Sequence, residues 1–333
     1  MLESPSVKPL LEVRELVKEY PSRDGRGPVR AVDRVSLVLA DGATLGIVGE
    51  SGSGKSTLAR LILRLIDPDS GEISFAGENL LALDGSALRR QRRNMQIVFQ
   101  DPYASLDPRM TIGAIISEPL AIHRIGTRGE RRDRTAHLLE IVGLDPSAAR
   151  RYPHEFSGGQ RQRIGIARAI ALEPKFIVLD EPVSALDVSI QSQVLNLLMD
   201  LKERLGLSYV FISHDLSVVE HMSDEIVVMY LGRIVERGPA DRLFNDPHHP
   251  YTRALVSAVL DPDPSRRRER VLLKGDQSAQ DMTPTGCRFH PRCSFAMDIC
   301  RMTPPRAVPL GEGTEVECFL YETAAPPPDR ESV

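Results

Sequence analysis

The sequence predicts an α/β fold: a mainly parallel sheet, a mostly helical subdomain inserted between two of its strands, and a small cysteine-containing C-terminal extension. From residue 10 to about 238, short apolar runs rich in Val, Ile and Phe alternate with segments of helical periodicity, as expected of a parallel α/β domain. Residues from about 111 to 171 are helical in pattern almost throughout. The four cysteines all lie between Cys287 and Cys318, so the extension differs in character from the rest.

Buried strands are expected where short apolar runs of strand length occur. These runs are 44–48, 95–99, 176–179 and 209–212. Helices are expected at 55–65, 160–172 and 187–205. In the last of these, one face carries a row of apolar residues, namely Val194, Leu197, Leu198 and Leu201.

The overall composition is that of a globular protein without a membrane span. The chain of 333 residues is long enough for one large domain and an appendage. Its 42 Lys and Arg against 46 Asp and Glu give a net charge of −4, which argues against a general nucleic-acid binder because such proteins usually carry excess basic residues. No stretch approaches the roughly 18 apolar residues that cross a bilayer, and the N-terminus has no secretion signal. We therefore expect a cytosolic protein that reaches a membrane only through partners.

The sequence changes character after residue 260. An Asp-Pro-Asp-Pro segment at 261–264 precedes three arginines and a polar stretch that runs to Thr285, a pattern typical of a solvated linker. The last ten residues include three consecutive prolines, as in disordered tails. We place the first domain at 10–245, with its helical subdomain at about 111–171, the extension at 246–320 and a disordered tail at 321–333.

A glycine-rich segment lies between the expected strand at 44–48 and the expected helix at 55–65. It fits the pattern G-x-x-x-x-G-K-S/T, in which backbone N–H groups and a helix N-terminus surround phosphates. Lys55 is expected to contact the β- and γ-phosphates of ATP, and the Ser56 hydroxyl to ligate Mg²⁺. The expected ATP-binding residues here are Gly49, Glu50, Ser51, Gly52, Ser53, Gly54, Lys55, Ser56 and Thr57.

The apolar run at 176–179 is followed by two carboxylates, Asp180 and Glu181. Acids at the end of a buried strand are a weak pattern alone, but they become specific downstream of a phosphate-binding loop. In ATPases with such a loop the first carboxylate holds the Mg²⁺ shell. The second is placed to polarise the attacking water as general base. We expect Asp180 in the first role and Glu181 in the second.

A second phosphate-binding helix start occurs at residues 156–160, with the sequence FSGGQ. One triphosphate does not need two such cradles in one subunit, whereas two subunits facing head to tail do, because each closes the other's nucleotide site. With this segment the chain resembles the ATP-binding-cassette (ABC) ATPase family, whose signature is LSGGQ; Phe156 replaces the leucine. The resemblance implies nucleotide contacts across the dimer from Ser157, Gly158, Gly159 and Gln160.

The resemblance implies roles for four more residues. Gln100, at the end of a strand, is similar to the Q-loop glutamine, which senses Mg²⁺, completes the catalytic group and contacts the membrane partner. His214 matches the switch histidine that touches the γ-phosphate. Asp187 ends a segment, 184–187, that looks like the D-loop, which communicates across the dimer. Tyr20 is similar to the aromatic residue that stacks on adenine, with simple packing as the alternative.

Two features favour a transporter subunit over an ABC ATPase that acts on nucleic acid or ribosomes. The segment between Gln100 and Ser157 has room for a compact helical subdomain only, not for a long coiled coil. The chain also carries one cassette, whereas ribosome-acting types carry two.

Segments 99–108, 249–255 and 286–293, with Cys318, resemble peptide and nickel importer ATPases. The expected solute is a dipeptide or oligopeptide, with nickel or a related solute as the alternative. The resemblance implies two integral-membrane permease subunits, a second cassette that is identical or a paralogue, and an extracytoplasmic solute-binding protein. It also implies a peripheral position on the cytoplasmic face of the bacterial inner membrane.

The cysteines follow the spacing C-x5-C-x6-C-x17-C, over Cys287, Cys293, Cys300 and Cys318. Structural zinc sites typically use tight C-x2–4-C pairs, which this spacing lacks, and four thiolates are the full ligand set of a 4Fe–4S cluster. Similar extensions of peptide-importer ATPases are associated with such clusters, and the resemblance therefore favours a cluster here. Zinc, or cysteines that are unligated or disulfide-linked, are the alternatives.

Overall fold

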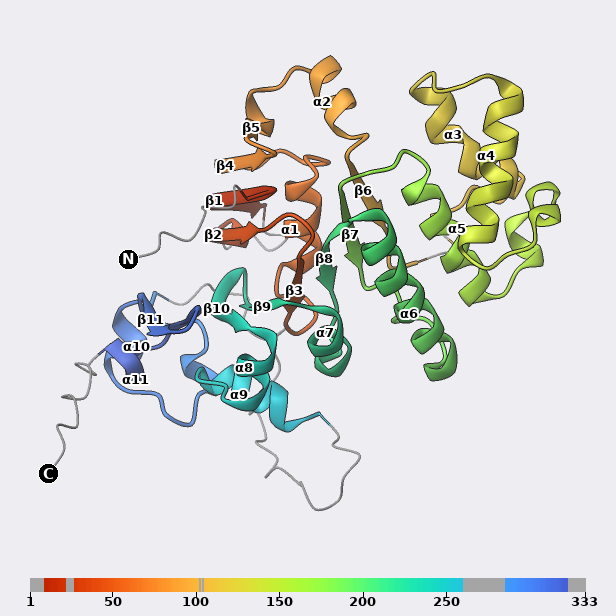
Figure 1. Cartoon of the computed structure of the whole chain (residues 1–333). Coiled ribbons are helices and arrows are strands. Elements are labelled where there is room, and N and C mark those ends of the chain that lie inside the picture. The colour runs from red at the N-terminus through yellow and green to blue at the C-terminus, as the bar shows by residue number, and fades with distance from the viewer. Residues whose placement is uncertain (1–8, 22–26, 102, 104, 260–284, 323–333) are drawn as a thin grey trace, which may run out of the picture.

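The computed structural model describes residues 9–21, 27–101, 103, 105–259 and 285–322. The linker expected after residue 260 lies outside these residues, and so do residues 323–333 of the tail expected at 321–333. Residues 321 and 322 instead end a short helix, Phe319–Glu322, so the predicted start of the tail was two residues too early. Two sheets organise the described part of the chain (Figure 1). The larger has the order β11-β12-β10-β9-β3-β8-β7-β6, and the smaller has the order β2-β1-β4-β5.

The middle of the larger sheet is parallel, as the alternating pattern predicts. Strands β6, β7, β8, β3 and β9 pair in parallel, and β10, β12 and β11 continue the sheet in antiparallel fashion. Every residue of β3, β7 and β8 is buried, because helices and the second sheet cover both faces. The strands are β3 (Thr44–Val48), β6 (Met95–Val98), β7 (Phe176–Asp180), β8 (Ser208–Ile212), β9 (Glu225–Tyr230), β10 (Arg233–Pro239), β11 (Ala307–Gly311) and β12 (Thr314–Glu317).

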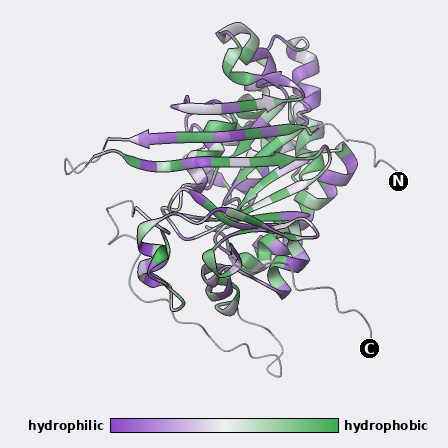
Figure 2. Ribbon diagram, turned by 90° about the vertical axis from the view of Figure 1, so that its left-hand side faces the viewer, coloured by the Kyte–Doolittle hydropathy of each residue, from purple (hydrophilic) through white to green (hydrophobic). Residues whose placement is uncertain are grey.

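Alternate residues of each parallel strand serve two separate cores. In β8, Tyr209 and Phe211 belong to one core and Val210 and Ile212 to the other, as the two-residue period of a strand requires. Figure 2 shows hydrophobic colour gathered on the strands of the interior and more hydrophilic colour on the outer helices.

The second sheet closes one of these cores. It is antiparallel and consists of β1 (Leu11–Tyr20), β2 (Val29–Leu39), β4 (Ser70–Phe75) and β5 (Glu78–Asn79). Its buried residues, together with those of α1 (Lys55–Ile62), form one apolar cluster with the facing side of the larger sheet. The helix that follows the phosphate-binding loop is thereby fixed between two sheets.

The helical subdomain lies between β6 and β7 in the chain and beside them in Figure 1. Its α-helices begin at side-chain caps: Thr111 accepts from Ala114, Thr127 forms a capping box with Glu130, and Ser157 starts the third. These helices are α3 (Ile112–Ile122), α4 (Arg128–Ile141) and α5 (Gly158–Ile170), with single 3-10 turns η2 (Pro146–Arg150) and η3 (Pro153–Glu155) before α5.

The expected helices form with small shifts at their ends. The helix predicted at 187–205 is α6 (Val188–Leu205), which ends at Gly206 with a left-handed φ of 64°. The helix predicted at 55–65 ends earlier, at Ile62. Arg64 turns to φ 46°, and its guanidinium donates to the carbonyls of Leu80 and Leu83. The other helices are η1 (Leu80–Ala82), α2 (Gly85–Gln91), α7 (Leu216–Met222), α8 (Ala240–Asn245), α9 (Pro250–Ser257), η6 (His290–Arg292), α10 (Ile299–Met302) and α11 (Phe319–Glu322).

The C-terminal extension is joined to the α/β core by sheet pairing and by a buried ion pair. Val316 of β12 is opposite Glu236 of β10, so the hairpin β11–β12 adds two strands to the larger sheet. Arg288 donates to the carboxylate of Asp33 in β2, and both side chains are buried. None of the helices among the described residues is both long and apolar enough to cross a bilayer.

Candidate nucleotide-binding site

The loop between β3 and α1 has a backbone that only glycine permits at two positions. Gly49 has φ 152° and Gly54 has φ 104°. A Cβ on Gly49 would lie 2.2 Å from the carbonyl oxygen of Met229, and one on Gly54 would lie 2.1 Å from that of Ala31. Gly54 is also the N-cap of α1 and supplies no side-chain hydrogen bond. The first N–H groups of this helix are therefore uncapped by a side chain, as in phosphate-binding loops.

Lys55 is buried at the start of α1 and turns back onto the loop. Its Nζ donates to the carbonyl oxygens of Gly49 and Glu50, at 2.7 and 2.9 Å. Burial lowers the pKa of Lys55, and the carboxylates of Glu181, Asp180 and Glu50 partly oppose that effect. Lys55 is thus a cation at the base of the loop, surrounded by oxygen atoms.

Ser56 and Asp180 place two oxygen atoms side by side. The Ser56 hydroxyl donates to Oδ1 of Asp180 at 3.2 Å. Burial raises the pKa of Asp180, Ser56 lowers it by hydrogen bonding, and the adjacent Glu181 raises it further. A buried carboxylate beside a second carboxylate favours a cation as its partner, and hydroxyl and carboxylate oxygens are ligands that Mg²⁺ prefers. These two residues fit a Mg²⁺ ion.

Three residues from three neighbouring strand ends meet at one carboxylate. Gln100 follows β6, Glu181 follows β7 and His214 follows β8, and these strands are adjacent and parallel. Gln100 Nε2 donates to Oε2 of Glu181 at 2.6 Å, and His214 Nδ1 lies 3.4 Å from the same oxygen. The structure therefore brings together the three residues expected to be catalytic, beside Asp180 and the loop.

The backbone of Glu181 is left-handed, with φ 48°, which is uncommon for a residue other than glycine. Its N–H donates to the carbonyl of Ile212 in β8 at 2.9 Å, and its carbonyl accepts from Ser184. These bonds hold a strained conformation at the end of the strand, a feature that clusters at functional sites.

The signature segment forms a separate group with the D-loop. Ser157 caps α5 in a capping box with Gln160: the backbone N–H of Gln160 donates to the Ser157 hydroxyl, and the backbone N–H of Ser157 donates to the Gln160 side-chain oxygen. A Cβ on Gly159 would lie 2.3 Å from Cγ2 of Ile190 in α6. The N-cap of α6 is Asp187. Within the described residues, neither Ser157 nor Asp187 shares a hydrogen bond with the phosphate-binding loop.

Tyr20 is the last residue of β1 in the antiparallel sheet. Its side chain is 39% exposed, and the Lys18 ammonium lies 5.9 Å from its ring centroid. Tyr20 is therefore partly exposed and is not packed in a core.

The Q-loop region is attached to α5 by two arginines that the sequence interpretation did not single out. The Arg161 guanidinium lies 3.6 Å from the ring centroid of Tyr103, and Arg168 donates to the carbonyl of Ser105 at 2.5 Å. Both arginines lie on α5, the helix capped by Ser157, so direct contacts join the Q-loop region to the helix that carries the signature segment. A basic residue on a helix gives no sequence signal of such a contact.

Two further residues that were missed reach the phosphate-binding loop from the extension. The backbone N–H of Glu50 donates to the Tyr251 hydroxyl at 2.8 Å. Arg292 donates to both carboxylate oxygens of Glu50, at 2.8 and 3.1 Å. Both lie in segments that resemble importer ATPases, but that resemblance gave no indication of this contact.

The four cysteines gather in the extension as free thiols. Each thiol lies within electrostatic reach of the other three. Burial raises the pKa of Cys287 to about 12 and that of Cys318 to about 11. Among the described residues, no group of three or more His, Cys, Asp or Glu side chains is arranged as a metal-ion site. The four cysteines expected to bind a cluster or zinc thus lie in the same extension, but the structure does not arrange them as a coordination shell.

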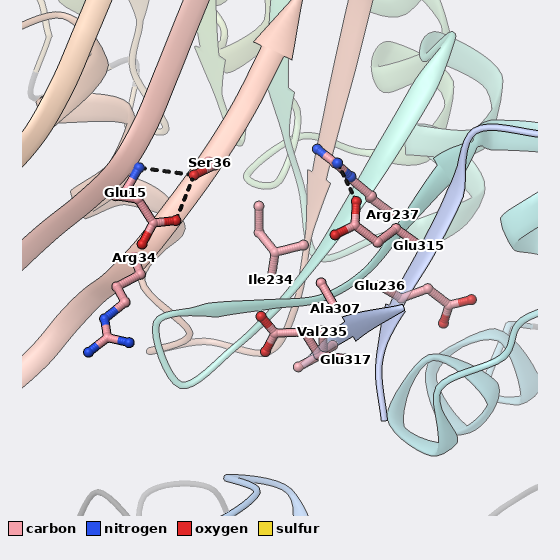
Figure 3. A pocket seen from close by; sticks show the side chains of 10 residues that line it. All are labelled: Glu15, Arg34, Ser36, Ile234, Val235, Glu236, Arg237, Ala307, Glu315 and Glu317. Carbon is pink, nitrogen blue, oxygen red and sulfur yellow. Dashed lines mark hydrogen bonds and ion pairs between the residues drawn. The ribbon is translucent and has the colours of Figure 1, made fainter. Parts of the chain in front are cut away.

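A small cavity of about 130 Å³ lies apart from this site, between the antiparallel sheet and the added edge of the larger sheet (Figure 3). Glu15 and Ser36 line it from one side, and Arg237 and Glu315, which form an ion pair, from the other. None of the residues expected to bind ATP lines it.

Comparisons with known proteins agree with this geometry. A family model described as ABC transporter matches residues 32–184, and one described as oligopeptide/dipeptide transporter, C-terminal region, matches 235–300. The chain is 50% identical over 315 residues to the dipeptide transport ATP-binding protein DppF of Haemophilus influenzae, covering 93% of this chain and 96% of that protein. It is 51% identical over 320 residues to the oligopeptide transport ATP-binding protein AppF of Bacillus subtilis, covering 94% and 97%.

Solved structures of cassettes share the fold. A dimeric ATP-binding cassette in a post-hydrolysis state, bound to ADP and Pi, superposes with a TM-score of 0.63 at 31% identity, covering 69% of this chain and 98% of the other. The chain therefore belongs to the ABC transporter family, as an ABC-type ATPase that carries the oligopeptide/dipeptide transporter C-terminal region.

Proposed function

We propose that this chain hydrolyses ATP to power the import of dipeptides or oligopeptides across a bacterial cytoplasmic membrane. The observation that carries the ATPase mechanism is the convergence of Gln100 and His214 on the carboxylate of Glu181, one residue after Asp180. The similarity to DppF, a dipeptide transport protein, and to AppF, an oligopeptide transport protein, supports peptides as the solute class. The alternatives, import of nickel or another solute and a non-transport role, have no comparable support.

Glu181 is the general base in this proposal. Its carboxylate accepts the hydrogen bond of Gln100 and lies near His214, so both can orient a water molecule that it polarises. His214 and Lys55 contact the γ-phosphate, and Tyr20 stacks on adenine. Since phosphoryl transfer needs little covalent chemistry from the protein, positioning and charge stabilisation supply most of the rate enhancement.

Ser56 and Asp180 would hold Mg²⁺, with Gln100 as a further oxygen ligand. The ion supplies charge neutralisation of the phosphates when bound. Other residues of the loop, Gly49 to Thr57, would contribute backbone N–H groups to the β- and γ-phosphates, but not Glu50 or Ser53, whose N–H groups donate to the Tyr251 hydroxyl and to the Glu50 carbonyl.

Ser157, Gly158, Gly159 and Gln160 act in trans. These residues lie at the start of α5, and Ser157 forms its hydrogen bonds with Gln160 and not with the phosphate-binding loop of the same chain. This arrangement supports a nucleotide site that is completed by a second cassette. Asp187, packed beside the signature helix through α6, would then lie at the dimer interface. The partner is an identical chain or a paralogue.

The membrane partners are two permease subunits, supplied with solute by an extracytoplasmic binding protein. Tyr103 is 64% exposed next to Gln100 and is a contact point for a permease. The chain would therefore be peripheral on the cytoplasmic face of the membrane. Nucleic acid is not a partner in this proposal.

In this proposal the four thiols of Cys287, Cys293, Cys300 and Cys318 would hold a 4Fe–4S cluster, with zinc as the alternative. The support for this proposal is that the four thiols lie in one small extension, within electrostatic reach of one another. Burial holds the thiol pKa values high, and metal binding would displace those protons because thiolates are the ligands.

The Glu181→Gln substitution tests the ATPase proposal. It removes the base while keeping the shape and the hydrogen bond to Gln100, so ATP binding should persist and turnover should fall by at least about a hundredfold. Nucleotide binding and phosphate release are measured on the same preparation, and Lys55→Ala serves as the control that loses binding. A Glu181→Gln protein that retains most of its hydrolysis would refute the assignment.

A further inference from the structure

One residue of the phosphate-binding loop, Glu50, is held by two residues from the C-terminal extension. Arg292 donates from Nη1 to Oε2 of Glu50 at 2.8 Å and from Nη2 to Oε1 at 3.1 Å, across a separation of 242 residues in the chain. The backbone N–H of the same Glu50 donates to the Tyr251 hydroxyl at 2.8 Å. We refer to Arg292 and Tyr251 as the Glu50 clamp.

Both clamp residues are themselves fixed. Tyr251 is fully buried, and its ring lies 4.7 Å from that of Tyr230 and 5.5 Å from that of Phe289. The Arg292 side chain is 6% exposed, and its guanidinium lies 5.9 Å from the Tyr230 ring centroid. A fixed donor loses little conformational entropy when it holds its partner, so the clamp can preorganise the loop.

Glu50 is in direct contact with the lysine of the site. Its carbonyl accepts from Lys55 Nζ at 2.9 Å, and its carboxylate is near enough to act on the Lys55 ammonium by Coulomb attraction. A free carboxylate at this place would repel the triphosphate and compete for Lys55. A bidentate arginine weakens both effects, because it offsets the negative charge and occupies both carboxylate oxygens of Glu50.

We propose that Arg292 and Tyr251 are positioning residues for ATP: from the C-terminal extension they fix the first turn of the phosphate-binding loop and cancel the charge of Glu50. ATP affinity then depends on the extension being packed against the core so that Arg292 and Tyr251 contact Glu50. This inference deepens the proposed ATPase function and rests on it.

The test measures the Kd of Mg²⁺-ATP in the full-length Glu181→Gln protein, in which binding is separated from hydrolysis. Arg292→Gln in that background should weaken binding about tenfold, the scale of losing one charge-assisted pair at the site. Tyr251→Phe removes only the hydroxyl and should weaken it about threefold. Arg306→Gln is the matched control, since Arg306 is an exposed arginine of the extension, and its Kd should not change.

A double substitution separates charge cancellation from simple structural support. Glu50→Gln combined with Arg292→Gln removes the carboxylate along with its partner, so affinity should recover to within about threefold of the parent. A clamp that acted only as a structural support would leave the double variant as weak as Arg292→Gln. That result, or an unchanged Kd in Arg292→Gln, would overturn the proposal.

Melting curves for each variant show whether the protein is folded. If Arg292→Gln does not fold, Arg292→Lys keeps the charge but loses the bidentate geometry, and it should show a smaller loss that grows as the salt concentration rises. If it does not, the proposal fails. A parent protein that binds no ATP at all would refute the proposed function, whereas a parent that binds normally beside unaffected clamp variants refutes only the clamp.

Discussion

Acidification should lower the stability of the folded chain through one buried histidine of the C-terminal extension. His249 is 1% exposed at the start of α9. Its unprotonated Nδ1 accepts from the backbone N–H of Tyr251 at 3.1 Å, and the backbone N–H of His249 donates to Oε2 of Glu236 at 2.9 Å. Burial, together with the smaller effect of the nearby Arg253, lowers the pKa of His249 to about 3.

The magnitude follows from linkage. The folded pKa is depressed below the unfolded value of about 6.5, so the neutral form contributes stability above pH 6.5 that is lost as pH falls toward 3. At pH 5.5 the unfolded chain binds one proton that the folded chain excludes, which costs about 1.4 kcal/mol relative to pH 7.5. For a chain of 333 residues the melting temperature should drop by about 2 °C on this account.

The assay compares melting curves of the wild-type chain and His249→Asn at pH 7.5 and 5.5. Asparagine keeps an oxygen that can accept from the Tyr251 N–H but does not titrate, so the variant should lack this part of the pH dependence. Glu236 contributes with the opposite sign because burial raises its pKa, and the comparison cancels it since both proteins retain Glu236. Equal pH dependence in the two proteins would refute the reasoning.

Two further outcomes can be measured directly. Mixing Ser157→Arg chains with Lys55→Ala chains should restore part of the ATPase activity that each lacks, since a mixed dimer has one intact site; no recovery in demonstrated mixed dimers would contradict action in trans. Anaerobically purified protein should contain about four irons per chain, and Cys300→Ser should lose them by iron analysis. Stoichiometric zinc without iron would favour the zinc alternative.

The phosphate-binding loop and the strand ends illustrate why much of the site was predictable. Residues 49–57 act through their own backbone, so their pattern is local. Gln100, Glu181 and His214 each follow a buried run, and adjacent parallel strands present their carboxyl ends at one edge, where the structure joins the three side chains. The predicted end of α1 was less accurate, because the hydrogen bonds that Arg64 donates to the carbonyls of Leu80 and Leu83 compete with another helical turn.

The sequence by itself determined most of the elements, the phosphate-binding loop and the residues expected to carry the chemistry, because turn geometry, helix capping and burial periodicity act over a few neighbouring residues. Only the tertiary structure decided that β12 would extend the sheet at β10 and that Arg292 and Tyr251 would hold Glu50. An arginine pairs equally well with any carboxylate that packing brings near it. The choice of Glu50 depends on how the buried rings of Tyr230, Tyr251 and Phe289 fit together, which no local pattern records.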